Sequence, residues 1–462
     1  MSEAHERGDE RERPISLYGI TDELVRRVHG ALEEGRAAEA VSLVSPLHAA
    51  DAADLLEQLP ASERDQLIAY LGSDLDAETF SHLDEAIRED VIENIDNALL
   101  ADVIVELESD DAVDFIESLE EVDQQEVLEA MPDLDRALLE DSLSFPEESA
   151  GRLMRRDPAI IPSYWNVGQT IDYMRSDAEL PNDFYLLMVV GPTHQPIGVV
   201  PLSRLLRTTR PVGITEIMDT EIRLIPAAMD QEEVAYLFRQ YGLVSAPVVD
   251  DHGRLIGIID VDDVVHVMDE EAEEDLLKLG GVREDDFYNA VVDTIRSRFS
   301  WLLVNLMTAI LASLVIGLFD AAIEKVVALA VLMPIVASMG GNAGTQTLTV
   351  AVRALAVKDL TASNALRIIG KETLVGGING IVFAVITGGI ATFWFGDPLI
   401  GGIIGAAMVV NLLLAGLAGT MIPLVLDRWG VDPAVGSTVV LTTITDVIGF
   451  LAFLGLAAWI LL

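Results

Sequence analysis

Apolar and polar residues alternate in three different ways along this chain. From about residue 16 to residue 139, apolar residues recur every three or four positions, with little glycine and few β-branched runs, which is typical of helices. From residue 151 to about 268, short β-branched runs alternate with helical stretches and predict mixed α and β structure. From residue 300 onward, long apolar segments predominate. The pattern predicts a helical region, a mixed region and a membrane-spanning region, in that order.

The helical and mixed regions both contain internal repeats. In the helical region, residues 48–59 share Asp, Ala, Asp, Glu and Leu at matching positions with residues 108–119, which predicts stacked helical hairpins. In the mixed region, Ile-Gly-Val-Val at residues 197–200 recurs as Ile-Gly-Ile-Ile at residues 256–259. Three more residues recur in the same order: Met154, Ile161 and Pro162 match Met218, Ile225 and Pro226. These matches predict a tandem duplication.

The last region contains five apolar segments, each long enough to cross ~30 Å of hydrocarbon. They are residues 300–319, 326–352, 373–395, 399–426 and 434–462. Basic residues lie before the first segment and between the second and third: Arg296, Arg298, Arg353, Lys358, Arg367 and Lys371. Because basic residues favour the cytosolic side, we expect the first 299 residues in the cytosol and the C-terminus outside. Residues 1–13 lack the apolar core of a secretory signal.

The charge of the chain is concentrated before residue 300. The 462 residues include 76 Asp and Glu against 29 Lys and Arg, for a net charge of −47. From residue 300 onward there are only 8 acidic and 6 basic residues, so −45 belongs to the preceding part. Such a surface attracts cations and repels phosphate backbones, so we expect no nucleic acid partner. Solubility in a salty cytosol is the plainer explanation of the acidity.

The second apolar segment is more polar than a plain membrane anchor needs to be. It contains Pro334 and then Gly340-Gly-Asn-Ala-Gly-Thr-Gln346. Because proline removes a helical donor and glycine loosens the helix, we expect the backbone to open here and turn carbonyls toward a water-filled path. Close helix packing through the GxxxG spacing is the alternative, but it leaves Asn342 and Gln346 unexplained.

The fifth apolar segment contains one acid. Asp446 is spaced by four from Thr442 and by eight from Thr438, so the three side chains share one helix face. A carboxylate in hydrocarbon costs about 3 kcal/mol, so we expect Asp446 to face a polar cavity. A structural bond to a neighbouring helix is the alternative.

The mixed region resembles a pair of CBS domains. Both halves end in a Gly-hydrophobic-hydrophobic segment before a helix, and Gly253-Arg-Leu-Ile-Gly-Ile-Ile-Asp-Val-Asp-Asp-Val264 is the clearest match. Many CBS units that bind nucleotides have Ser or Thr three residues before Asp. This chain has Asp260 before Asp263, and Pro201 and Arg204 in the first unit. The resemblance makes ATP a candidate ligand of these domains.

Almost the whole chain resembles the MgtE family of magnesium channels. The matching motifs are Glu147-Glu-Ser-Ala-Gly-Arg-Leu-Met154, the segment 340–346 with Arg353-Ala-Leu-Ala356, and Val431-Asp-Pro-Ala434 with Asp446-Val-Ile-Gly449. The resemblance implies a multidomain membrane protein with an all-α helical-repeat N-domain, α+β tandem CBS domains, a connecting helix and a five-helix transmembrane domain. The expected bounds are a disordered tail at 1–15, the N-domain at 16–145, CBS domains at 146–210 and 211–268, the connecting (plug) helix at 269–298 and the transmembrane domain at 299–462.

The resemblance also implies which residues handle the transported ion. Asp446 matches a pore carboxylate that holds hydrated magnesium, and Asn342, Thr438 and Thr442 match other polar or backbone contacts of the pore. Magnesium prefers oxygen ligands and sheds water reluctantly, which agrees with these groups. Thr438 and Thr442 stand where relatives can have Asn and Ala. Because one such face forms half a pore, we expect a homodimer.

A second set of acids is implied to regulate the channel. Asp263, Glu271, Glu274 and Asp275 match positions that bind cytosolic magnesium in the family, between a CBS domain and the connecting helix. Carboxylates about 4 Å apart repel by ~4 kcal/mol at an effective dielectric of about 20, and a divalent ion reverses that sign. Rising internal magnesium is then expected to close the pore. A solvated acidic helix is the alternative, and His266 stands among these positions where relatives can have an acid.

The expected function is therefore a dimeric magnesium channel of the cell membrane, surrounded by lipid, with Mg²⁺ both transported and regulatory. The chain has no cysteine, no HExxH and no GxxxxGK[ST], and we expect no enzyme activity. An ion-coupled exchanger of divalent cations is the alternative among transporters. A membrane-anchored CBS nucleotide sensor is the alternative from another class, but an anchor needs neither Asp446 nor the segment 334–346.

Overall fold

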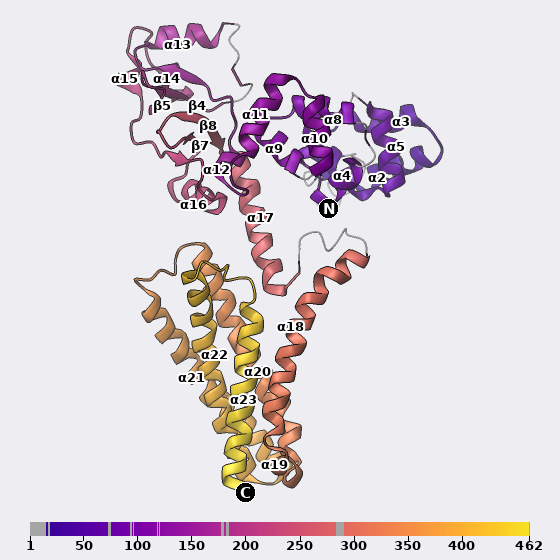
Figure 1. Ribbon diagram of the computed structural model, residues 1–462, viewed down its shortest axis with the longest axis vertical. Coiled ribbons are helices and arrows are strands. Elements are labelled where there is room, and N and C mark those ends of the chain that lie inside the picture. Colours follow the sequence, from indigo (N-terminus) through magenta and orange to yellow (C-terminus); the bar gives the residue numbers. More distant parts are fainter. Residues whose placement is uncertain are drawn as a thin grey trace, which may run out of the picture. The chain divides into compact units, whose positions relative to one another are not determined.

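The computed structural model describes residues 15–461, except 17–18, 73–74, 93–94, 96, 118, 120, 177–179, 182–183 and 283–290. The chain forms two compact units, Met1–Asp269 and Glu270–Leu462 (Figure 1). The first unit carries the helical domain and both three-stranded sheets, and the second is built of helices. The predicted disordered tail lies outside the described residues except for Ile15, and so does part of the predicted connecting helix.

The first unit opens with a small antiparallel hairpin of β1 (Ile15–Ser16) and β2 (Gly19–Ile20). The sequence pattern predicted helices only, and this prediction was wrong at the hairpin. Gly19 begins β2 at φ +94°, a conformation that side chains rarely adopt. The helices that follow are α2 (Asp22–Glu33), α3 (Ala37–Val44), α4 (Ala49–Gln58), α5 (Ala61–Leu71), α6 (Glu78–Ser81), α7 (Glu85–Ile92), α8 (Asn97–Glu106), α9 (Ser109–Glu117), α10 (Glu121–Ala130) and α11 (Asp133–Leu143).

The repeat in the helical domain is visible in its core. Leu55 and Leu56 of α4 are fully buried, and so are Phe115 and Ile116, which occupy the matching positions of α9. All four belong to one apolar cluster, in which the ring of Phe80 meets Phe115 edge-on at 6.1 Å between centroids. The predicted helical repeat is confirmed, because equivalent residues of the two copies fill the same core.

The mixed region contains two sheets of identical topology. In the first, β3 (Ile160–Pro162) is parallel to β4 (Leu186–Val190), which is antiparallel to β5 (Pro196–Pro201). In the second, β6 (Ile225–Pro226), β7 (Ser245–Val249) and β8 (Leu255–Asp260) repeat that arrangement. The register shifts at the same point in both, after Val189 and after Val248. The associated helices are α12 (Ala150–Leu153), α13 (Val167–Met174), α14 (Leu202–Arg207), α15 (Ile214–Ile217) and α16 (Gln231–Tyr241).

The repeated Ile-Gly motif has a steric cause. A Cβ atom on Gly198 of β5 would lie 2.7 Å from the Asp219 carbonyl oxygen, and one on Gly257 of β8 would lie 2.7 Å from the Arg155 carbonyl oxygen. At each place a neighbouring backbone crosses the strand and pairs with it. Glycine is therefore required twice for the same reason, which confirms the tandem duplication.

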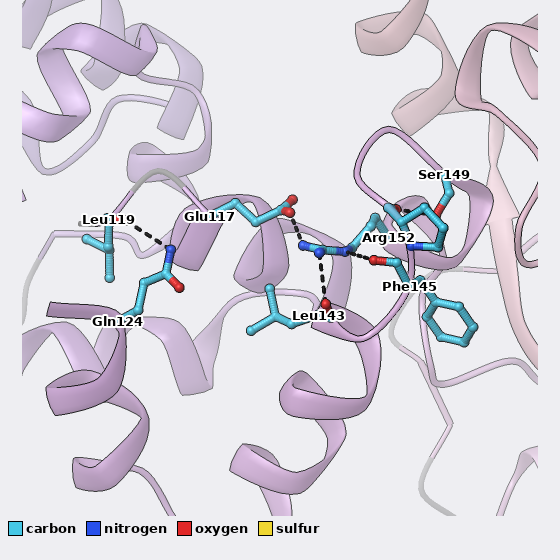
Figure 2. Close-up of polar contacts among 8 residues, drawn as sticks. Glu117, Leu119, Gln124, Leu143, Phe145, Ser149 and Arg152 are labelled. Carbon is cyan, nitrogen blue, oxygen red and sulfur yellow. Dashed lines mark hydrogen bonds and ion pairs between the residues drawn. The ribbon is translucent and has the colours of Figure 1, made fainter. Parts of the chain in front are cut away.

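Arg152 joins the helical domain to the mixed region (Figure 2). From α12, its guanidinium donates to the carbonyl oxygens of Phe145 and Leu143, each at 2.8 Å, and pairs with the Glu117 carboxylate of α9. Ser149 donates to the Pro146 carbonyl at 2.6 Å and fixes the turn before α12. The motif at residues 147–154 thus secures the junction between these two parts of the first unit.

Among its described residues, the second unit contains five helices long and apolar enough to cross a membrane, which confirms the predicted five-helix domain. α22 packs against α20, α21 and α23, and α18 packs against α23 (Figure 1). α17 runs without a break through the predicted boundary at residue 268. α17 (Val261–Gly280) begins in the first unit and ends in the second. The other elements of the second unit are α18 (Val291–Gly317), α19 (Asp320–Lys325), α20 (Ala328–Ala356), α21 (Ala365–Phe395), α22 (Pro398–Arg428) and α23 (Ser437–Leu461).

Candidate cation sites

The polar face of α23 carries an acid within the apolar part of that helix. Asp446 is partly buried, and its carboxylate forms no hydrogen bond or ion pair with any residue that the structure describes. The Thr442 hydroxyl donates to the Thr438 carbonyl at 2.9 Å, so only its lone pairs face outward. A lone carboxylate among hydroxyl oxygens provides acceptors for a hydrated cation, and here it has no protein donor to occupy it.

A second polar face lies on α20. Asn342, Thr345, Gln346 and Thr349 recur at helical spacing, are exposed, and line an open groove of about 470 Å³. The Asn342 amide donates to the Ser338 hydroxyl at 3.3 Å, one turn earlier on the same helix. The predicted pore residues therefore lie on two helices that pack against each other, Asn342 on α20 and Thr438, Thr442 and Asp446 on α23.

The backbone of α20 does not open, and that prediction was wrong. The helix is continuous from Ala328 to Ala356 with Pro334 inside it. Its glycines serve packing: a Cβ on Gly340 would lie 2.2 Å from Asn411 Nδ2, and one on Gly344 would lie 2.9 Å from the Leu441 side chain. The alternative of close helix packing holds for these glycines, while Asn342 and Gln346 remain on the exposed face.

Sequence reasoning missed Asn411 of α22. This amide is fully buried, donates to the Val336 carbonyl at 2.8 Å, and lies where Cβ atoms on Gly340 and Gly449 would stand. It thereby ties α22 to α20 and α23. Its carbonyl oxygen has no partner among the described residues. The signal of this role in the sequence was an amide side chain in the largely apolar stretch of residues 400–426.

The end of α17 is attached to the membrane helices. The Lys278 ammonium lies 2.9 Å from Asp432 Oδ2 and also pairs with Glu274. One residue later, the Leu279 carbonyl accepts from the Thr438 hydroxyl at 3.2 Å. Asp275 is half-buried beside these groups, and burial, followed by the charge of Asp432, raises its pKa. We call this set the connecting-helix seat: Glu274, Asp275, Lys278, Leu279, Asp432 and Thr438.

A crowded acid cluster lies in the first unit, where α9, α12, β8 and α17 meet. Arg155 is its cation, at 2.9 Å from Glu108 and 3.8 Å from Asp260. Asp263 accepts from the Asp260 backbone N–H at 3.3 Å. Asp110 and Asp260 are buried, and each has a carboxylate oxygen without a partner among the described residues. The members of this acid cluster are Glu108, Asp110, Asp157, Asp260, Asp262 and Asp263.

Ionisation of the carboxylates in this cluster is unfavourable. Burial, and then the charge of Asp262, raise the pKa of Asp263 to about 7. Burial, and then the charge of Asp263, raise the pKa of Asp110 well above its usual value. A bound divalent cation would relieve both effects. Asp110 was not identified from the sequence, although residues 108–119 stood out as a repeat.

The predicted regulatory residues are divided between the two units. Asp263 belongs to the acid cluster of the first unit, whereas Glu274 and Asp275 belong to the connecting-helix seat of the second. Glu271 lies on α17 between them. His266 faces the ring of His82 at 6.2 Å between centroids, and His82 faces His48 at 6.4 Å. Within the described residues, no three His, Asp or Glu side chains already form a cage for a metal ion.

The CBS cleft is lined by residues of both sheets. They include Arg155, Asp157, Tyr185, Ser245, Ile258 and Asp260. Two carboxylates and one guanidinium thus border a space of about 10 Å³, which holds about one water molecule. Asp260, which replaces the Ser or Thr of many nucleotide-binding units, lies near Arg155.

A helical domain, a duplicated α and β domain and five membrane helices, with an acid on α23 that is unpaired among the described residues, define the class of a membrane cation transporter. Comparison with family models agrees with each part. Residues 47–148 match the MgtE intracellular N domain, residues 214–270 match the CBS domain, and residues 333–456 match the MgtE divalent cation transporter model.

Two curated relatives, both called magnesium transporter MgtE, show the family. The protein of Thermus thermophilus is 33% identical over 329 residues, covering 71% of this chain and 73% of the relative. That of Bacillus subtilis is 32% identical over 317 residues, covering 68% and 70%. A crystal structure of the cytosolic domain of the Mg²⁺ channel MgtE in complex with ATP is 26% identical, with a TM-score of 0.49 over 53% of this chain and 99% of that one. The chain belongs to the MgtE family, and it is a membrane protein that transports magnesium.

Proposed function

We propose that this magnesium transporter is a dimeric, Mg²⁺-selective channel that cytosolic Mg²⁺ closes. The observation that carries the proposal is the unpaired Asp446 carboxylate on the polar face of α23. A carboxylate at this depth is costly unless it meets water or an ion. With no cationic side chain paired to it among the described residues, Asp446 provides one negative charge per chain, enough to attract a hydrated divalent ion without holding it permanently.

The dimer is supported by the groove on α20. Asn342, Thr345, Gln346 and Thr349 are exposed in a single chain, where lipid would contact them at a cost. A second copy facing this groove would enclose the polar groups around water instead. We propose that Asn342, Thr438, Thr442 and Asp446 of both copies line the shared path.

Regulation by cytosolic Mg²⁺ is supported by the two acidic groups outside the membrane helices. In the acid cluster, Asp110 and Asp263 carry raised pKa values and unmet negative charge, which a divalent ion would neutralise. On α17, we propose that Glu271, Glu274 and Asp275 contribute a second regulatory contact. Both groups lie in segments expected in the cytosol, with the C-terminus of the chain on the outer face.

ATP binding at the CBS cleft stays a prediction. Tyr185 is exposed and offers apolar surface for a base. Arg155 would be the donor for a phosphate, although it is 6% exposed and already pairs with Glu108, Asp157 and Asp260. Asp157 and Asp260 would repel that phosphate, so we expect weak binding. Calorimetric titration of the whole protein with ATP, compared with an Asp260→Thr variant, tests this point, with tighter binding expected for the variant.

The function is tested by recording from the whole protein in planar bilayers and proteoliposomes. We expect single-channel Mg²⁺ currents at low Mg²⁺ on the cytosolic face and their suppression at millimolar Mg²⁺. Flux that requires a counter-ion gradient and yields no unitary currents would favour the exchanger. Nucleotide binding without any flux, from a folded and correctly oriented protein, would favour the sensor.

The connecting helix is tested separately by neutralising Glu271, Glu274 and Asp275 together as glutamines. We expect permeation to remain while its inhibition moves to higher cytosolic Mg²⁺, by about tenfold, because the carboxylates that the ion would bridge are gone. A matched triple change at Glu232, Glu233 and Asp251, on the second CBS unit, should leave inhibition unchanged. An unaltered inhibition curve for the connecting-helix variant would contradict the regulatory role and favour the alternative that these acids form a solvated helix face.

A further inference from the structure

The connecting-helix seat already contains a cation, and it belongs to the chain. Lys278 Nζ lies between the carboxylates of Glu274, one turn earlier on α17, and Asp432, in the segment between α22 and α23. Burial alone would lower the pKa of Lys278, but the hydrogen bonds to Glu274 and Asp432 raise it overall, so the ammonium stays charged. The side chain is 29% exposed, which limits screening by solvent.

The residues that follow Lys278 also contact the membrane helices. The residue after it, Leu279, packs among Leu348, Leu441 and Ile444 of the membrane helices. Its carbonyl accepts from Thr438, which lies on the same face of α23 as Asp446. Gly281 then lies against the indole of Trp301, so close that a Cβ atom would clash with the ring. Lys278 therefore secures a helix end that lies on the polar face of α23.

We propose that Lys278 is a tethered cation that holds the connecting-helix seat together in the absence of magnesium. Three carboxylates, Glu274, Asp275 and Asp432, meet there, and without the ammonium they would repel one another. Lys278 supplies one positive charge permanently, and a divalent ion is then needed only for the remaining negative charge. The role in gating rests on the proposed function, whereas the contact itself does not.

Removing the ammonium should make the seat depend on magnesium. In Lys278→Gln the side chain keeps much of its length but loses its charge, so we expect the seat to separate without divalent ions and to re-form when Mg²⁺ bridges the carboxylates. Lys278→Arg keeps the charge and should behave as wild type. Asp432→Asn removes the partner charge while its amide oxygen can still accept from the Ala434 N–H, as the carboxylate does at 2.8 Å.

The mobility of a spin label shows whether the connecting-helix seat is formed, without any measurement of transport. The chain has no cysteine, and Leu276 of α17 is 69% exposed, so Leu276→Cys gives one labelling site close to Lys278. In EDTA we expect an immobile label in wild type and Lys278→Arg, and a mobile label in Lys278→Gln and Asp432→Asn. Millimolar Mg²⁺ should immobilise the label in Lys278→Gln. Lys371→Gln, which removes a lysine paired with Glu372 at the start of α21, is the matched control and should stay immobile.

Flux measurements on the same proteins then test the gating role. The seat that Lys278 holds in wild type is expected to reduce the current at low cytosolic Mg²⁺ without abolishing it. With no Mg²⁺ on the cytosolic face, Lys278→Gln should therefore pass at least about fivefold more Mg²⁺ than wild type, the low end of typical coupling between two sites. A label that stays immobile in EDTA in both Lys278→Gln and Asp432→Asn would overturn the proposal, and so would equal mobility in Lys371→Gln. If no variant shows flux while the label behaves as expected, the proposed channel function fails and the tethered cation stands.

Discussion

The polar face of α23 and the acid cluster of the first unit use carboxylates in opposite ways. Asp446 stands alone, without an ion pair among the described residues. The acid cluster gathers six carboxylates around Arg155. A site in a pore must bind the ion weakly, because the ion has to leave it again. A sensing site must have an unfavourable conformational energy without the ion, so that binding of the ion shifts the equilibrium. The difference indicates how one protein can both move and sense the same cation.

The largest effect should come from the membrane helices. We expect Asp446→Ala to reduce Mg²⁺ flux by about a hundredfold, equivalent to about 2.7 kcal/mol, because the path loses its charge. Flux into proteoliposomes is the measurement, and gel filtration shows whether assembly is intact. Asp427→Asn, which removes an exposed acid at the end of α22, is the matched control and should retain flux. Normal flux through Asp446→Ala would show that Asp446 is not a transport site, and the difference proposed between α23 and the acid cluster would then be wrong.

Neutralising the acid cluster should leave permeation and change sensing. For Asp110→Asn combined with Asp263→Asn, we expect inhibition by cytosolic Mg²⁺ to require about tenfold more ion, since the repulsion that Mg²⁺ relieves is reduced. Inhibition curves at fixed membrane potential measure this shift. Asp172→Asn and Asp219→Asn together remove two charges elsewhere in the mixed region and serve as the comparison. A loss of permeation instead would mean that the cluster is needed for folding or opening.

The acid cluster also predicts a dependence of stability on pH. The pKa of Asp263 is raised to about 7, so its stabilising contribution is full below the ordinary pKa of an aspartate and is lost as the pH rises through about 7. In EDTA, the melting temperature of the whole protein in detergent should therefore fall by a few degrees between pH 5.5 and 7.5. Mg²⁺ should oppose the fall, and Asp263→Asn should flatten it. A fall that persists unchanged in Asp263→Asn would assign it to other groups.

The smallest effect should follow from Thr442→Val. The Thr442 hydroxyl proton is already given to the backbone, so the change removes only lone pairs from the polar face. We expect flux to drop about twofold to threefold, as for one modest hydrogen bond of about 0.5 kcal/mol. Thr443→Val, whose hydroxyl also bonds within α23, provides the comparison. A loss as large as that of Asp446→Ala would show that Thr442 contacts the ion directly.

Much of the fold could be predicted because its causes are local. The repeated Ile-Gly motif marks two strands that a neighbouring backbone crosses, and the apolar runs mark the membrane helices by length alone. The hairpin before α2 was missed because its strands have only two residues each. The prediction that the backbone of α20 opens was wrong because a proline and several glycines occur both in opened helices and in tightly packed ones. The contacts of Gly340 with Asn411 decide between them.

The candidate sites were predictable only where a single residue is costly by itself. An acid such as Asp446 is conspicuous because it lies in an apolar segment. Asp110 and Arg155 become informative only when α9 and the segment after α12 bring them together with Asp263, and no spacing in the sequence indicates that. Lys278 was not identified from the sequence, because its partner Asp432 lies more than 150 residues away in the chain.

The amide of Asn411 has an evolutionary consequence. It occupies the space left by the missing side chains of Gly340 and Gly449, with its nitrogen 2.2 Å and 2.7 Å from where their Cβ atoms would stand. None of these three positions can enlarge alone. Across an alignment of related sequences they should co-vary as a triplet, with alanine at either glycine accompanied by a smaller residue in place of the asparagine.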